Sequence, residues 1–150
     1  MTAPPPLARL FAIAYRSLVD DLHEALRRRG WIDVRPAFGF VLLAAADAPT
    51  TVSDLAALMG TSKQAASKLV DVMEDAGYVR RGTDAADTRQ RPVRLTPRGR
   101  RLLDAVEAIY EELEQGWADV IGTHGVERVR RDLTKVLAVD GPLPPVRPTW

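Results

Sequence analysis

Two short apolar segments that meet at a single glycine, Gly60, constrain the fold of this chain more than any other feature. Residues 53–59, which read SDLAALM, predict one short helix. A second helix follows at once, with Thr61 as its predicted N-cap and Gln64 at the capping-box position three residues later. The residues predicted to face inward on it are Ala65, Leu69, Val72, Met73 and Ala76. Gly77 ends this helix, and two helices joined by so tight a turn predict a helix-turn-helix.

Apolar residues at helical spacing predict four further helices around this pair. They cover about residues 6–28, 34–46, 97–121 and 126–136, and the third of them begins at a Thr96-Pro97 pair suited to a helix start. In the second, Phe38, Val41 and Leu42 are predicted to face inward.

The helix over residues 97–121 carries two adjacent apolar stripes. One contains Leu102, Val106, Ile109, Leu113 and Val120, and the other contains Leu103, Tyr110 and Trp117. This is more apolar surface than one small core needs. We therefore expect a dimer through residues 6–28 and about 102–139.

A polar connection that is too long for a tight turn separates two predicted strands. Residues 78–81 and 92–95 have the strand pattern, whereas compact hairpins usually close with about two to five residues. The charged residues of the connection are Asp84, Asp87, Arg89 and Arg91. Guanidinium groups suit the narrow, strongly negative minor groove of DNA, and a solvated loop without a binding role is the alternative.

Composition fits one globular domain and argues against several classes of function. The 150 residues are 46% hydrophobic, which is enough for a core without disulfides or a structural metal. The chain has no cysteine and only two distant histidines, so neither thiol chemistry nor a metal site is expected. No catalytic motif indicates an enzyme, and no cofactor is expected. Because no apolar run approaches the roughly 20 residues that span a bilayer, we expect a cytoplasmic protein without a membrane partner.

Positive charge is concentrated in one part of the sequence. The formal net charge is only +1, yet residues 61–101 carry ten basic and five acidic groups, a local excess of +5. Residues 102–150 carry five basic and nine acidic groups, a net of −4. A local excess of this kind is typical of a nucleic-acid-binding face, and an ordinary solvated surface is the alternative.

The element order and one long stretch of sequence resemble the MarR family of bacterial winged-helix transcription regulators. The stretch is SDLAALMGTSKQAASKLVDVMEDAGYVRRGTDAADTRQRPVRLTPRGRRLL. Its most specific part is D-x-x-D-x-R, here Asp84, Asp87 and Arg89, followed by Leu95-Thr96 and Gly99. The resemblance covers about residues 35–105 by motif and the whole chain by element order.

This resemblance implies a mostly α fold with a small β-hairpin wing, a winged helix-turn-helix with N- and C-terminal dimerisation helices. Residues 1–33 would hold the first dimerisation helix, residues 34–98 the DNA-binding lobe, and residues 99–150 the last helices and tail, in one intertwined domain. The implied function is a homodimeric, sequence-specific regulator, expected to be a repressor relieved by a small-molecule effector. A winged-helix module that binds proteins rather than DNA is the alternative.

In such a homodimer each recognition helix enters a major groove of a palindromic operator and a wing arginine reaches the neighbouring minor groove. The residues expected to contact DNA are Ser62, Lys63, Gln64, Ser67, Lys68, Arg89, Arg91 and Arg98. Gln64 is either a capping residue or a reader of adenine, and Ser62 is either a phosphate contact or part of the first turn. Asp87 is expected to orient the wing, because DNA repels an anion.

Three arginines at one helix start, at positions 98, 100 and 101, oppose the helix dipole. Without an obvious partner inside the chain they predict contacts to phosphates, and plain exposure is the alternative. A small aromatic effector is expected near His23, Trp31 and Phe38, which otherwise simply pack in the core or the dimer interface.

Overall fold

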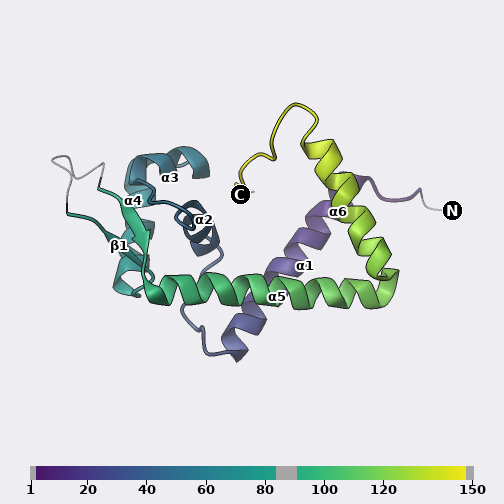
Figure 1. The fold of residues 1–150 in the computed structure, drawn as a ribbon, viewed down its shortest axis with the longest axis horizontal. Coiled ribbons are helices and arrows are strands. Elements are labelled where there is room, and N and C mark those ends of the chain that lie inside the picture. The colour runs from purple at the N-terminus through teal and green to yellow at the C-terminus, as the bar shows by residue number, and fades with distance from the viewer. Residues whose placement is uncertain (1–2, 84–90, 148–150) are drawn as a thin grey trace.

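The computed structural model describes residues 3–83 and 91–147, and these form six helices and a two-stranded hairpin (Figure 1). In chain order the elements are α1 (Leu7–Arg28), α2 (Phe38–Ala44), α3 (Val52–Met59), α4 (Lys63–Asp75), β1 (Val79–Arg81), β2 (Val93–Leu95), α5 (Pro97–Ile121) and α6 (Thr123–Leu137). The predicted winged helix-turn-helix is confirmed.

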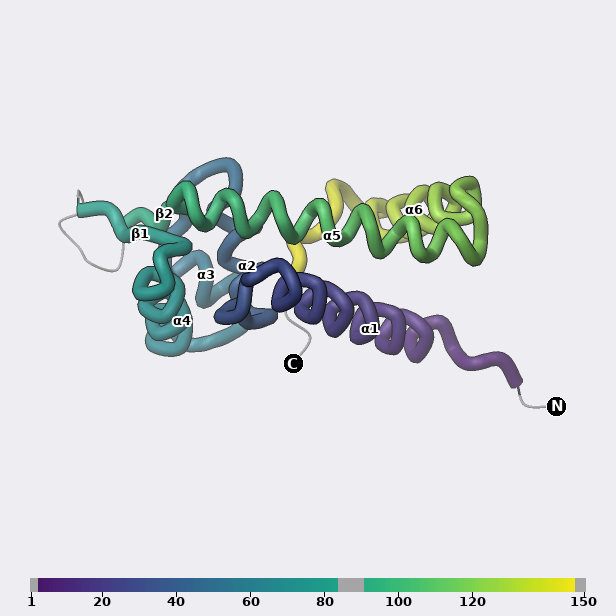
Figure 2. Tube along the Cα trace, turned by 90° about the horizontal axis from the view of Figure 1, so that it is seen from below, coloured from purple at the N-terminus to yellow at the C-terminus, as the bar shows by residue number. Residues whose placement is uncertain are grey.

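The long helix α5 connects the two parts of the molecule. Figure 1 shows it running from a lobe that contains α2, α3, α4 and the hairpin to the turn into α6. Both α1 and α6 pack against α5, and Figure 2 shows α1 alongside it. The lobe therefore sits at one end, and the first and last helices lie toward the other.

The core lies where the lobe meets the N-terminal half of α5. Its fully buried side chains include Leu26, Phe38, Leu42, Leu55, Met73, Tyr78 and Leu102. Among the described residues, both strands and all helices other than α6 contribute to this core. Burying a side chain of this size contributes roughly 1.5–3 kcal/mol, so the core fixes the lobe on α5.

The second helix of the helix-turn-helix begins one residue later than the sequence predicts. Ser62 is the N-cap, and its Oγ accepts a hydrogen bond from the backbone N–H of Ala65 at 3.1 Å. The predicted capping box of Thr61 and Gln64 is therefore wrong, because Gln64 is only the second residue of α4. The inner face shifts with it: Ala65 is exposed, while Ala66, Val70 and Met73 are buried.

Helix α2 also begins later than predicted. The amide of Phe38 donates to the carbonyl of Arg35 and the amide of Gly39 to that of Pro36, which are turn bonds over three residues. Regular α-helix starts only at Phe38 because these tighter bonds occupy the first turn. The predicted inward residues Phe38, Val41 and Leu42 are all buried.

The hairpin packs tightly on the start of α5. Strands β1 and β2 are antiparallel, with Val79 opposite Leu95 and Arg81 opposite Val93. Thr96 caps α5 through the backbone N–H of Gly99, and a Cβ on Gly99 would lie 2.0 Å from the carbonyl oxygen of Tyr78. Only glycine fits here, which gives a steric reason for the Gly99 of the family motif.

Apolar side chains remain exposed away from the lobe. Helix α6 buries none of its residues, and in α5 Val120 is 84% exposed although Leu102 and Ile109 are buried. On α1, Leu7 and Ile13 are exposed as well. In the part of the chain that the structure describes, no helix is both long and apolar enough to span a membrane.

Candidate nucleic-acid interface

The outer face of α4 carries four of the residues expected to contact DNA. Lys63, Gln64, Ser67 and Lys68 are spaced so that they share one side of the helix, opposite the buried Met73. Lys63, Gln64 and Lys68 are exposed and Ser67 is half-buried. The structure therefore brings these four residues together as predicted, while Ser62 is occupied as the N-cap.

A polar cavity lies between the helix-turn-helix and the hairpin. It has a volume of about 310 Å³ and is called the wing cavity below. Its lining residues are Val52, Ser53, Lys63, Gln64, Ser67, Arg81 and Arg91. None of these is acidic, and because Arg81 is ion-paired with Asp71 and Glu74, the cations left to meet a negatively charged ligand are Lys63 and Arg91.

Arg81 holds the hairpin against α4, a role that the sequence analysis did not identify. One terminal nitrogen lies 2.8 Å from Asp71 Oδ1 and 3.2 Å from Glu74 Oε1. The other donates to the backbone carbonyl and to Oγ of Ser67, both at 3.2 Å. The side chain is only 12% exposed. The only signal for this role in the sequence was the position of Arg81 in a predicted strand, seven residues after Glu74 of the preceding helix.

Arg91 is held by the base of the hairpin. Arg91 Nε donates to the carbonyl of Gly82 at 2.6 Å, and the amide of Gly82 donates to the carbonyl of Pro92 at 2.7 Å. Arg91 thus joins the lining of the wing cavity. Asp87 and Arg89 lie outside the described residues, so the wing-orienting role of Asp87 and the DNA contact of Arg89 stay predictions.

Two of the three arginines at the start of α5, Arg98 and Arg100, have partners inside the chain. The prediction that these arginines lack partners inside the chain is therefore wrong for these two. Arg98 donates to the carbonyl of Ala76 at 3.1 Å, to the Tyr78 hydroxyl at 3.2 Å, and lies 3.6 Å from Asp33. Arg100 donates to the carbonyl of Ala46. Both side chains can therefore lie at a positive helix end without an external phosphate.

Of the three predicted effector residues, His23 alone lines the cavity that lies between α1, α2 and α5 among the described residues. The ring of Phe38 is fully buried, with its centroid 5.9 Å from that of Tyr78, and the Trp31 centroid is 6.1 Å from the same ring. The Arg98 guanidinium lies over Trp31, 5.4 Å from its centroid. Phe38 and Trp31 thus pack around Tyr78 and Arg98.

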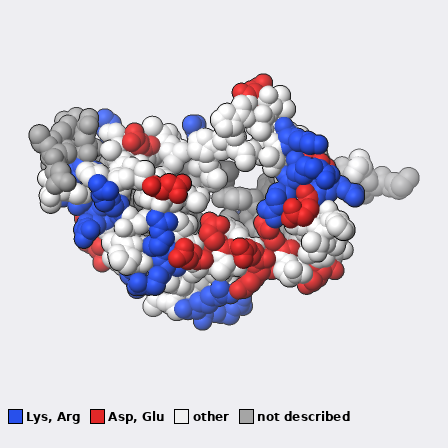
Figure 3. Space-filling view, in the orientation of Figure 1, with Lys and Arg blue, Asp and Glu red and all other residues white. Residues whose placement is uncertain are grey.

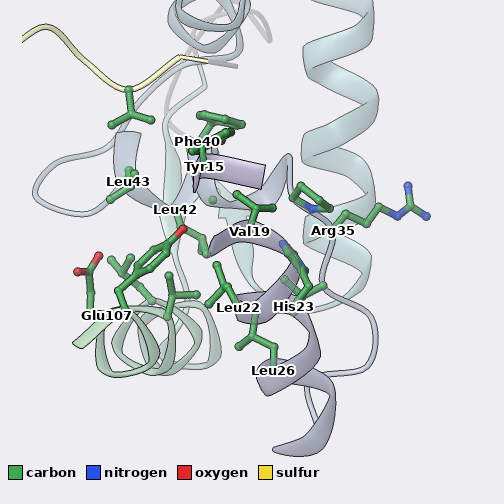
Figure 4. Close-up of a pocket in the computed structure, with 17 residues that line it drawn as sticks. Tyr15, Val19, Leu22, His23, Leu26, Arg35, Phe40, Leu42, Leu43 and Glu107 are labelled. Atoms are coloured by element: carbon green, nitrogen blue, oxygen red, sulfur yellow. The ribbon is translucent and has the colours of Figure 1, made fainter. Parts of the chain in front are cut away.

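That second cavity lies between α1, α2 and α5 and has a volume of about 120 Å³ (Figure 4). Its walls are mostly apolar, and its polar lining residues are Tyr15, His23, Arg35, Glu107 and Tyr110. In Figure 4 the guanidinium of Arg35 points away from the other lining residues. Val146, from the segment after α6, also lines this cavity.

Burial shifts two titratable groups of this second cavity. It lowers the pKa of His23, and the nearby charge of Arg27 acts in the same direction. It also raises the pKa of the Tyr110 phenol. Both shifts favour the neutral form of the side chain, which suits a cavity with apolar walls.

The charged residues are distributed unevenly along the molecule (Figure 3). Blue lysine and arginine side chains lie at the end that carries the hairpin, at the lower middle and, mixed with red ones, at the end that carries α6, while red acidic side chains cover the middle. Between Leu102 and Leu113, helix α5 exposes the acidic residues Asp104, Glu107, Glu111 and Glu112. The view therefore shows basic side chains at the hairpin end but no concentration of them there alone.

Comparisons with known proteins agree with this architecture. The model of the MarR family matches residues 40–90, and no curated protein matches the chain. MarR of E. coli in its apo form has a TM-score of 0.75 at 23% identity, over 91% of this chain and 99% of that chain.

Two further solved structures were found in bound states. A mutant of MepR from S. aureus bound to an oligodeoxyribonucleotide has a TM-score of 0.61 at 24% identity, over 91% of this chain and 99% of that one. A MarR family protein of Mycobacterium tuberculosis in complex with salicylic acid has a TM-score of 0.68 at 23% identity, with the same two coverages. The MarR family model thus matches the helix-turn-helix and hairpin segment of this chain, and the solved structures share its fold.

Proposed function

We propose that the chain is a sequence-specific DNA-binding transcription regulator that acts in the cytoplasm as a homodimer on a palindromic operator. The observation that carries this proposal is the shared surface of α4 and the hairpin, where Lys63, Gln64, Ser67 and Arg91 border one cavity without a carboxylate in its lining. Phosphate contacts from lysine and arginine supply affinity for DNA, and side chains on a helix in the major groove supply specificity. The oligodeoxyribonucleotide bound to MepR supports the same reading.

The proposed DNA contacts are Lys63, Gln64, Ser67, Lys68 and Arg91 together with Arg89 of the wing. Ser62 would contribute through its capped helix start, whose free amides attract a phosphate. Arg98 would meet a phosphate only by giving up its bonds to Ala76 and Tyr78. Gln64 is free to read a base, since the capping role is taken by Ser62.

The dimer would form through α1, the outer half of α5 and α6. Val120, Val136 and Leu7 are 84%, 70% and 67% exposed, and a second copy would cover them. Contiguous apolar surfaces of this kind mark interaction sites in soluble proteins. A two-fold dimer also provides the two recognition helices that a palindromic operator requires.

The proposed mode of regulation is repression relieved by a small aromatic effector. The cavity beside His23 is apolar, contains a few polar groups and lies between the dimerisation helix α1 and the lobe. A ligand there could change how the lobe sits on α5, and the salicylic acid bound to the M. tuberculosis relative fits such a site.

Fluorescence anisotropy with DNA from upstream of the protein's own coding sequence tests the proposal. We expect saturable binding at stated salt, a steep loss of affinity as salt rises, and much weaker binding to scrambled DNA of equal length. Equal affinity for both DNAs would contradict sequence specificity. The alternative, a module that binds only proteins, predicts no binding to either DNA.

A further inference from the structure

We propose that the segment after α6 is a lid on the cavity between α1, α2 and α5, and that Val146 closes over a small aromatic ligand bound there. The inference rests on the proposed effector binding and adds a ligand-covering residue and a route of entry to it. Among the described residues, Val146 is the only lining residue outside α1, α5 and residues 34–43.

The segment reaches this cavity along apolar surface. Leu143 lines the groove between α1, α5 and α6, where Trp117 and Leu133 also lie. Three residues later, Val146 lines the cavity. Figure 2 shows the segment, in yellow, passing from α6 beside α5 toward α2, and Figure 4 shows it on the side of the cavity where Leu43 lies. Two apolar side chains therefore hold the segment against the body of the molecule.

The prolines of this segment suit it to lie on apolar surface. Residues 142–147 read PLPPVR. Proline has no backbone N–H, so the three prolines bring no donor that an apolar contact would leave unpaired. A proline-rich chain is also extended, at about 3.1 Å per residue, so roughly 9 Å separates Leu143 from Val146 along the chain. The two side chains can therefore contact two separate sites.

Only apolar contacts hold the lid closed. The last hydrogen bond along the segment joins the amide of Gly141 to the carbonyl of Ala138 at 3.3 Å, and within the described residues none follows it. The other walls are fixed, because α1, α2 and α5 contribute side chains to the core and turn hydrogen bonds close the linker before α2. The segment is therefore the wall that opens most easily, and its opening admits a ligand.

A bound ring would favour the closed lid. The cavity volume of about 120 Å³ is close to the roughly 150 Å³ of an apolar cavity that binds benzene, so one aromatic ring is the size of ligand that it takes. Val146 is 57% exposed, so its side chain has apolar surface left to bury. A ring beneath it supplies the surface against which this burial occurs, and the ligand and the lid therefore stabilise each other.

Fluorine NMR titration with para-fluorophenol tests the lid in the full chain. Val146→Ser should weaken binding by about three- to tenfold and speed dissociation, because it removes an apolar wall. Val146→Ile keeps that wall and should bind as the wild type does. Val139→Ser is the matched control, since Val139 is 76% exposed and does not line this cavity. Val106→Phe, which narrows the cavity, should abolish binding and so locates the ligand.

A second experiment follows the segment itself. The chain has no cysteine, so a Val146→Cys variant carries a single thiol. Saturating para-fluorophenol should slow the alkylation of this thiol by iodoacetamide severalfold, because the ligand favours the closed lid. The thiol of a Val139→Cys variant should react at the same rate with and without the ligand. An unchanged rate for Val146→Cys would overturn the lid.

The outcomes separate the lid from the proposed effector site. If para-fluorophenol binds but Val146→Ser binds it as tightly as the wild type, the lid alone is overturned. Tighter binding by Val146→Ser would mean that the segment competes with the ligand, which also overturns the lid. If the wild type does not bind the ligand, or if binding survives Val106→Phe, both the lid and the effector site in this cavity fail. Urea unfolding and sedimentation show whether each variant keeps its fold and its state of association.

Discussion

The hydroxyl of Tyr78 donates a hydrogen bond to Asp33 across 2.5 Å, and this bond ties the base of the hairpin to the linker after α1. Arg98 completes the junction, because its guanidinium lies 3.6 Å from Asp33 and 4.8 Å from the centroid of the Tyr78 ring. The junction joins the start of α5, the end of α4 and the α1–α2 linker. Any movement of the lobe relative to α1 would have to strain or break it.

We expect stability to fall at alkaline pH through Tyr78. Burial, and secondly its hydrogen bond to Asp33, raise the pKa of this phenol from 10.0 to about 12. A raised pKa means that the stabilisation is fully present below pH 10, the ordinary value, and is lost as pH rises toward 12. Urea unfolding over this range should show a loss on the order of 2 kcal/mol. Tyr78→Phe should be less stable at neutral pH and should show a smaller loss; an identical pH dependence would contradict the assignment.

Gly99→Ala should destabilise the fold severely. The added Cβ would lie 2.0 Å from the carbonyl oxygen of Tyr78, so α5 or the hairpin must shift. We expect a loss of about 3 kcal/mol or more in the free energy of unfolding. Gly116→Ala is the matched control, since a Cβ at Gly116 meets no atom within 4 Å and alanine stabilises a helix interior by about 0.5–1 kcal/mol. Equal effects of the two changes would show that α5 does not press on the hairpin.

The elements of this fold were predictable because each begins or ends at a local signal. Thr96 and Pro97 begin α5, Gly60 adopts a φ of 62° between α3 and α4, and the apolar spacing of α1 gives its extent. The error at Thr61 arose because two adjacent residues, Thr61 and Ser62, can both cap a helix. Only tertiary packing, which buries Ala66 rather than Ala65, decides between them.

The site was less predictable because its side chains find partners far away in the sequence. Arg98 reaches Asp33, and Arg81 reaches Ser67, across separations that no local pattern reveals. Charge alone made both arginines look like surface cations available for phosphates. The four outward residues of α4 were predictable, since helical periodicity fixes which positions lie opposite the core.

Val120→Glu should separate the dimer without unfolding the chain. The side chain of Val120 is 84% exposed in the single chain, so a charge there should change the stability of the monomer by no more than about 0.5 kcal/mol. Buried between two copies, the same charge would oppose association. Sedimentation at micromolar concentration should show a dimer for the wild type and a monomer for the variant.

A change at Leu113 would be a poorer test, because Leu113 packs against the core of its own chain and Leu113→Glu should unfold it as well. Ala108→Glu, at an exposed position in the lobe-proximal half of α5, is the control and should remain dimeric. A wild type that sediments as a helical monomer would rule out the dimer.

We expect His23 to reduce stability under mildly acidic conditions. Its pKa is lowered from 6.5, first by burial and then by Arg27. A lowered pKa in the folded state means that the unfolded chain binds the proton more readily, so stability falls as pH drops below 6.5. Urea unfolding between neutral pH and about pH 5 should show a smaller fall for His23→Gln than for the wild type. His124→Gln serves as the control. If this variant, rather than His23→Gln, showed the smaller fall in stability, the prediction would be refuted.

Arg89→Ala should weaken DNA binding while it leaves folding almost untouched. Arg89 belongs to the tip between β1 and β2, outside the described residues, and the hairpin base that carries this tip is anchored by the buried Val79 and Val93. A surface change of this kind alters stability by no more than about 0.5 kcal/mol. If the guanidinium reads a base edge, operator binding should weaken by roughly 1–3 kcal/mol and discrimination against other DNA should fall.

If Arg89 meets only a phosphate, binding should weaken on every sequence and the salt slope should drop by about one. Arg128→Ala, which removes an exposed cation on α6 far from the hairpin, is the control for the general effect of charge. Anisotropy titrations of both variants at several salt concentrations distinguish these cases. A variant of Arg89 with the affinity and salt slope of the wild type would mean that the tip is a solvated loop. The contacts of α4 and Arg91 would then have to account for all binding by the lobe.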